Sequence, residues 1–107
     1  MRKLLLIALL IVGCSSISNE EVSGIWIKSD RIGYDNEKWI IQQNGNYSWE
    51  SYDWKENGKF KLKFAGEEII CFTPSKSNHN SINREYCRSI SIIDENNIMI
   101  DDTIFKK

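Results

Sequence analysis

The sequence has little of what most enzyme sites require. Its 107 residues include one histidine, His79, one proline and six glycines. No glycine-rich phosphate-binding pattern is present, and no serine or cysteine stands in a recognisable nucleophile motif. With one histidine and no such motif, the chain is predicted to have no catalytic residues and no cofactor, and hence not to be an enzyme.

A long hydrophobic run is also missing. The apolar stretch from Leu4 to Val12 falls short of the roughly 20 residues that span a bilayer. It follows the basic start Met1-Arg2-Lys3 and ends at a small residue, Gly13. A basic start, a short apolar run and a small residue at the cleavage point are typical of a secretory signal peptide.

The end of this segment, Ile11-Val12-Gly13-Cys14, resembles the lipobox of bacterial lipoproteins. The resemblance implies that residues 1–13 are removed and that the thiol of Cys14 carries a diacylglyceryl group. Residues 14–22 then form a lipidated tether, polar from Ile17 to Val22, and residues 23–107 form one β domain. The expected location is the bacterial cell envelope, with the membrane as one partner. Because Ser15 is not aspartate, the resemblance favours the outer membrane, on its periplasmic face or surface, in a Gram-negative organism.

Charge argues against nucleic acid as a partner. Removal of Arg2 and Lys3 leaves 12 basic residues against 15 acidic ones, a net charge of −3. A nucleic-acid-binding domain normally carries a basic patch and a high isoelectric point. A protein partner in the envelope is the expectation instead.

Two cysteines remain once Cys14 is assigned to the anchor. In an oxidising compartment Cys71 and Cys87 predict one disulfide. The alternative is a redox or metal-binding pair. Two distant cysteines around His79 lack zinc-finger spacing, however, so no metal site is predicted.

The mature chain has β patterning throughout and no ten-residue segment of helical period. Turn residues recur at short intervals, which is typical of an antiparallel all-β fold. We therefore expect a small meander of about seven or eight strands that closes into a barrel or half-open barrel. The expected strands cover residues 24–28, 38–43, 46–52, 59–64, 68–73, 85–93, 98–101 and 103–105.

Local signals place the turns between these strands. Asn44-Gly45 predicts a tight hairpin, because type I′ turns need positive φ at both central residues. Asn57-Gly58 is assigned to the next turn, and Lys59 to Phe64 alternates in strict period two, with the lysines toward water. Pro74 is expected to end the fifth strand and to begin a polar loop through Asn83.

The order of these elements resembles the small bacterial lipocalin-like lipoproteins. Gly24-Ile25-Trp26 matches their first-strand motif, and Ile40 to Trp49 matches the following hairpin with an Asn-Gly turn. Gly58 to Leu62 and the hairpin Ile90 to Ile100 match the later strands. The resemblance implies a lipocalin-like barrel. In longer lipocalins an arginine packs over the first-strand tryptophan. No arginine stands beside the final residues Phe105-Lys106-Lys107. We also expect the interior of the barrel to be filled with side chains.

One surface is a candidate for partner binding. Trp54 lies between Asp53 and Lys55, and with Tyr52 it forms a candidate recognition patch, since tryptophan and tyrosine are favoured interface anchors. Burial in the core or simple capping is the ordinary alternative. Lys59, Lys61 and Lys63 extend this surface as a basic stripe, for which a solvated strand face is the ordinary explanation.

Three functions remain open. The first is a non-enzymatic binding or interaction module tethered to the envelope. The second is an inhibitor of a host lysozyme-type enzyme, which the size, location and disulfide resemble. The third is a carrier of a small apolar ligand, as the lipocalin resemblance implies.

Overall fold

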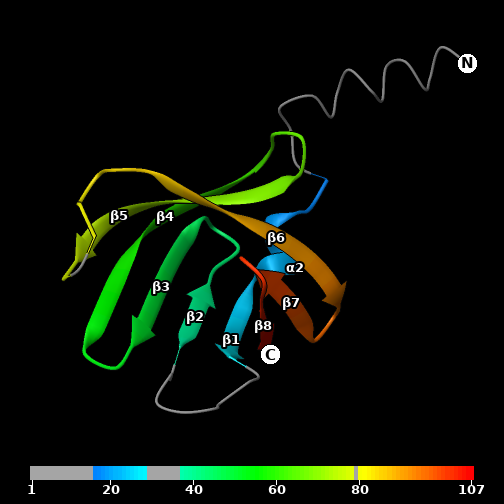
Figure 1. Cartoon of the computed structure of the whole chain (residues 1–107), viewed down its shortest axis with the longest axis horizontal. Coiled ribbons are helices and arrows are strands. Elements are labelled where there is room, and N and C mark those ends of the chain that lie inside the picture. Colours follow the sequence, from blue (N-terminus) through cyan, green and yellow to red (C-terminus); the bar gives the residue numbers. More distant parts are fainter. Residues whose placement is uncertain (1–15, 29–36, 79) are drawn as a thin grey trace, which may run out of the picture.

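A computed structural model describes residues 16–28, 37–78 and 80–107, which form a closed antiparallel β-barrel. Each strand pairs with the next along the chain, and the last pairs back to the first, through Ile27 opposite Lys106 and Lys28 opposite Phe105 (Figure 1). The predicted all-β meander is confirmed, with the barrel closed. Its eight strands are β1 (Gly24–Lys28), β2 (Lys38–Ile41), β3 (Asn46–Ser51), β4 (Trp54–Phe64), β5 (Glu68–Ser77), β6 (Tyr86–Asp94), β7 (Asn97–Ile100) and β8 (Thr103–Lys106).

Alternate side chains of every strand point into the barrel and fill it. The largest fully buried side chains are aromatic and include Trp26, Tyr47, Phe72 and Phe105. Aromatic residues contribute most of the apolar burial in a domain of this size. The core that the structure describes is therefore built largely of aromatic and branched aliphatic side chains.

Residues Ile17 to Val22 do not form the polar tether that the sequence predicts. Asn19–Val22 is a short helix, α2, and the side chain of Ser18 caps it in a capping box with Glu21. Val22 is fully buried, and its carbonyl oxygen accepts a hydrogen bond of 2.8 Å from Trp26 Nε1. A hydrophobic residue in the core makes the helix part of the barrel. The predicted signal peptide and Cys14 lie outside the described residues.

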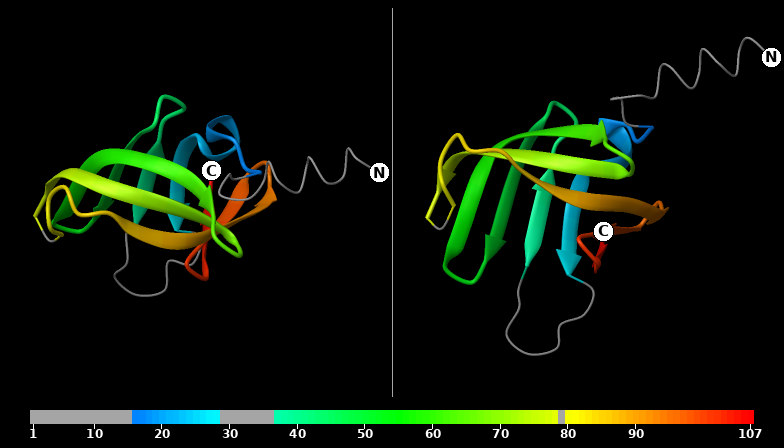
Figure 2. Two further views of the ribbon diagram at one scale, coloured as in Figure 1. Left: turned by 90° about the horizontal axis from the view of Figure 1, so that it is seen from above. Right: turned by 45° about the horizontal axis from the view of Figure 1, so that its top comes forward.

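The helix lies at one end of the barrel, and the turn between β3 and β4 lies at the other (Figure 2). Asn19 Nδ2 donates to the carbonyl oxygen of Gln43, beside the β2–β3 turn. The backbone N–H of Ser16 donates to Glu68 Oε1 at 2.9 Å, at the start of β5. We call the end of the barrel that carries α2 the helix end. The opposite end is the hairpin end, and the turn of Tyr52 and Asp53 between β3 and β4 is its hairpin tip.

The predicted turn at Asn57-Gly58 and the predicted strand end at Pro74 are both wrong, for one shared reason. Gly58 lies inside β4 directly opposite Pro74 in β5, and the register shifts there because Ser75 is an extra residue on β5. Such a β-bulge tolerates a proline within a sheet. A Cβ at Gly58 would lie only 2.9 Å from Pro74 Cα, so glycine is required for the close approach.

A cation does pack over the first-strand tryptophan. Lys107 Nζ lies 5.2 Å from the ring centroid of Trp26, within the range of a cation–π interaction. Lys107 therefore supplies the cation over Trp26, where the lipocalin resemblance would place an arginine. Together with α2 it closes the helix end around Trp26.

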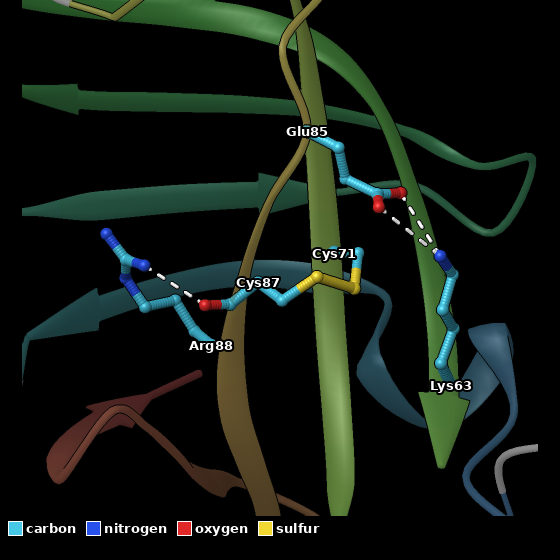
Figure 3. The surroundings of a disulfide bond; sticks show 5 residues. All are labelled: Lys63, Cys71, Glu85, Cys87 and Arg88. Carbon is cyan, nitrogen blue, oxygen red and sulfur yellow. Dashed lines mark hydrogen bonds and ion pairs between the residues drawn. A yellow bond between two sulfur atoms is a disulfide. The ribbon is translucent and has the colours of Figure 1, made fainter. Parts of the chain in front are cut away.

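The predicted disulfide is present. Cys71 on β5 and Cys87 on β6 are directly opposite each other in the sheet and are bonded (Figure 3). Beside the bond, Lys63 Nζ pairs with Glu85 at 3.3 Å, and Arg88 donates to the carbonyl oxygen of Cys87. The bond joins β5 to β6 covalently. Along the chain these two strands are linked only by the long 78–85 connection.

Removal of the disulfide is expected to destabilise the domain. The two cysteines are 16 residues apart, and closure of such a loop contributes about 3 kcal/mol to the free energy of unfolding in the chain-entropy model. Urea denaturation of the double variant Cys71→Ser/Cys87→Ser, with dithiothreitol-treated wild type as control, measures this difference. A urea midpoint equal to that of the oxidised wild type, in both the double variant and the reduced protein, would contradict this prediction.

Candidate functional site

A charged side chain lies buried inside the hairpin end. Glu56 on β4 is only 3% exposed and points inward in phase with Phe60. A buried carboxylate is costly unless hydrogen bonds replace its water. Within the described part of the chain, the donors to Glu56 include Tyr47 Oη at 2.7 Å, Tyr86 Oη, Ser77 Oγ at 3.1 Å and Asn80 Nδ2 at 2.8 Å.

These contacts set the protonation states of the group. Burial alone would raise the pKa of Glu56, but the hydrogen bonds from Tyr86, Tyr47, Asn80 and Ser77 outweigh it and lower the pKa below the ordinary 4.5. Burial, followed by the hydrogen bond to Glu56, raises the pKa of both phenols. Glu56 is therefore a carboxylate at neutral pH, and both tyrosines are protonated donors.

An aromatic cluster is connected to this carboxylate through Tyr47 and Tyr86, whose hydroxyls donate to Glu56. Trp39 stacks on Phe72 with 4.5 Å between centroids, and it lies 6.0 Å from Trp49 and 6.1 Å from Tyr47. Trp39 is only 5% exposed, yet its Nε1 has no acceptor among the described residues. A buried donor without a partner is rare and calls for an explanation.

A hollow opens beside this cluster. It has a volume of about 110 Å³ and is lined by Glu37, Trp39, Trp49, Asn80, Tyr86 and Arg88. Trp49 Nε1 donates to Glu37 Oε2 at 3.0 Å, and the guanidinium carbon of Arg88 lies 4.9 Å from the Tyr86 centroid. A second hollow of about 260 Å³ shares Asn80, Tyr86 and Arg88 with the first. The two hollows are thus adjacent, and both border residues that Glu56 holds.

The hairpin tip carries the predicted aromatic patch. Tyr52 is 49% exposed and Trp54 is 48% exposed, so the alternative that Trp54 belongs to the core is excluded. Asn78 braces the tip: its Nδ2 donates to the carbonyl oxygen of Asp53 at 2.6 Å, and its Oδ1 accepts from the Lys55 N–H at 2.9 Å. The tip is therefore held to the start of the 78–85 connection, part of which lines the hollow.

The predicted lysines do not cluster with these aromatics. Lys59 and Lys61 are exposed along β4, and Lys63 is paired with Glu85 near the disulfide. At about 3.3 Å per residue, Lys59 lies roughly 16 Å and Lys63 roughly 30 Å along the strand from Trp54. The basic stripe therefore runs away from the tip toward the helix end.

The structure also places the residues considered for metal binding. Cys71, Glu85 and Cys87 offer ligand atoms within 4.8 Å of one another, but the two sulfurs are joined in the disulfide. A metal would need thiolates, which this group does not offer while the bond is intact. His79 lies outside the described residues.

Comparison of the chain with protein-family models, with curated proteins and with solved structures found no match. Within residues 16–28, 37–78 and 80–107, no helix has the length and hydrophobicity needed to cross a membrane.

Sequence reasoning missed Glu56, because Asn57-Gly58 was assigned to a turn. The signal that could have revealed it is the alternation of β4, which continues back from Leu62 and Phe60 through Gly58 to Glu56. A glutamate in the apolar phase of a strand indicates a buried carboxylate with dedicated donors.

Glu56→Gln is expected to destabilise the protein in a pH-dependent way. The amide nitrogen of glutamine would face groups that donate hydrogen bonds and could not accept from them. The loss of the charged hydrogen bonds lowers the free energy of unfolding by about 2 kcal/mol at neutral pH. The lowered pKa of Glu56 means that its contribution is complete above 4.5 and is lost as the pH falls below that value. The difference between wild type and variant should therefore shrink in acid.

Urea unfolding at neutral pH and at about pH 3 tests this linkage. Glu95→Gln, on the exposed β6–β7 turn, is the matched control and should change stability little at either pH. A difference for Glu56→Gln that stays constant with pH would show that the carboxylate is not the source.

Proposed function

We propose that this chain is a lipoprotein of the bacterial envelope whose β-barrel is a non-enzymatic binding module, and that the hairpin end meets a protein partner. The observation that carries the proposal is the exposed pair Tyr52 and Trp54 on a braced turn. Function by contact, without chemistry, also agrees with the absence of a nucleophile motif from the sequence.

The position of the proposed anchor supports this orientation. Cys14 precedes Ser16 by two residues, and Ser16 is bonded to Glu68 at the helix end. Two extended residues span about 7 Å, so a lipid on Cys14 would hold the helix end close to the membrane. The hairpin end would then point away from the membrane, where a partner can reach it.

The tip has the properties of an interface anchor. Tryptophan and tyrosine dominate binding energy at interfaces, and a surface already held in its bound shape loses less entropy on association. Asn78 fixes the backbone on both sides of the turn, through Asp53 and Lys55. By contrast, a filled core that includes Trp26 and Phe72 gives little support to the alternative of an apolar-ligand carrier.

Lipidation is tested directly on the protein purified from its native membrane. Mass spectrometry should find an amino terminus at Cys14 bearing diacylglyceryl through a thioether, and Cys14→Ala should remain unprocessed in the same cells. An unmodified thiol on the wild type would refute the anchor and with it the orientation.

The partner is sought by affinity capture from native membranes, followed by measurement of Kd. Trp54→Ala should weaken the captured complex about thirtyfold, the effect of losing an interface residue worth about 2 kcal/mol. Ile93→Ala is the control, since Ile93 is equally exposed, at 50%, but lies at the end of β6. Equal effects of the two substitutions would exclude the tip as the binding surface.

A further inference from the structure

We propose that the hollow lined by Glu37, Trp49, Tyr86 and Arg88 binds one neutral sugar ring. This small-ligand site lies beside the hairpin tip and goes beyond the proposed protein-binding function. It is assigned from the size of the hollow, its balance of charge and its aromatic walls.

The first hollow has room for about one small ring. The hollow measures about 110 Å³, against the 300–1,000 Å³ typical of sites for drug-sized molecules. The adjoining hollow of about 260 Å³ shares three lining residues with it. A ring seated in the first hollow could thus continue into a second residue of a glycan.

Charge selects a neutral ligand with both donors and acceptors. The charged residues that line the two hollows are Glu37, Glu85, Arg84 and Arg88, so their formal charges cancel. An anion would meet Glu37, and a cation would meet Arg88. A hydroxyl group donates one hydrogen bond and accepts others, so neighbouring hydroxyls on one ring can satisfy both residues at once.

The walls suit the faces of such a ring. Trp39, Trp49 and Tyr86 are aromatic, and the face of an aromatic ring carries negative charge density. The C–H groups on the face of a sugar ring are weakly positive and apolar. A wall of rings beside polar residues therefore matches a molecule with C–H faces and a hydroxyl rim.

The site is organised before any ligand arrives. Tyr86 and Asn80 are fixed by Glu56, and Trp49 is fixed by Glu37. Arg88 is held by the carbonyl oxygen of Cys87 (Figure 3). A guanidinium has five donors and a carboxylate accepts several bonds, so these residues keep capacity for a ligand.

Indole N–H resonances report on the site directly, because the chain has four tryptophans. The ¹⁵N-labelled mature lipoprotein, in a detergent without a sugar headgroup, is titrated with glucose, N-acetylglucosamine and chitotriose. The Trp39 and Trp49 signals should shift saturably with at least one of them, with Kd about 1 mM for a single ring. Trp26, bonded to Val22 at the helix end, is the internal control and should not shift.

Substitutions then assign the binding to this hollow. Glu37→Gln and Arg88→Gln should each weaken it about tenfold, since each removes a charged hydrogen-bonding group. Lys61→Gln, on the outer face of β4, is the matched control. Trp54→Ala should leave sugar binding unchanged, which separates this site from the protein surface at the tip.

Two results would overturn the proposal. One is the lack of a saturable shift of Trp39 or Trp49 with all three sugars at about 10 mM, well above the expected Kd. The other is saturation by glycine but by no sugar, which would assign Glu37 and Arg88 to the two charges of a zwitterion. Neither result bears on the effect of Trp54→Ala on partner capture.

Discussion

The hairpin end of this barrel depends on one buried carboxylate. Glu56 is only 3% exposed, and an unpaired charge there would cost several kcal/mol. Its donors among the described residues come from β3, β5, β6 and the 78–85 connection. The carboxylate is satisfied only when all of these segments are in place, so it makes the closure of this end cooperative. Partial pairing would leave a charge without its donors.

The same carboxylate links the fold to the candidate sites. Tyr86 and Asn80 donate to Glu56 and also line both hollows. Asn78, two residues before Asn80, braces the turn that carries Tyr52 and Trp54. Side chains locked in this way lose little freedom on binding. Stability and recognition at the hairpin end therefore share one set of contacts.

Period-two patterning predicted the strands well, because the strands of a barrel alternate between core and solvent. The errors arose where two residues that normally interrupt strands face each other. Gly58 and Pro74 face each other across a bulge, and each is tolerated inside its strand because of the other. Local sequence does not show that they are opposite each other, so it predicted a strand end at both. That error hid Glu56, and with it the hollow, whose residues come from β2, β3, β6 and the 78–85 connection. The disulfide of Cys71 and Cys87 was predictable from the number of cysteines and from the oxidising compartment that the sequence predicts.

The small size of the barrel directs binding to its ends. A barrel of eight strands is just wide enough to be filled by side chains, and here Trp26, Tyr47, Phe72 and Phe105 fill it. Of the two ends, α2 and Lys107 cover one around Trp26. The other holds a buried carboxylate, an indole N–H without an acceptor among the described residues and exposed aromatic side chains, which are expensive to retain in so small a domain. Stability alone does not account for these features, which is why we propose the binding function at the hairpin end.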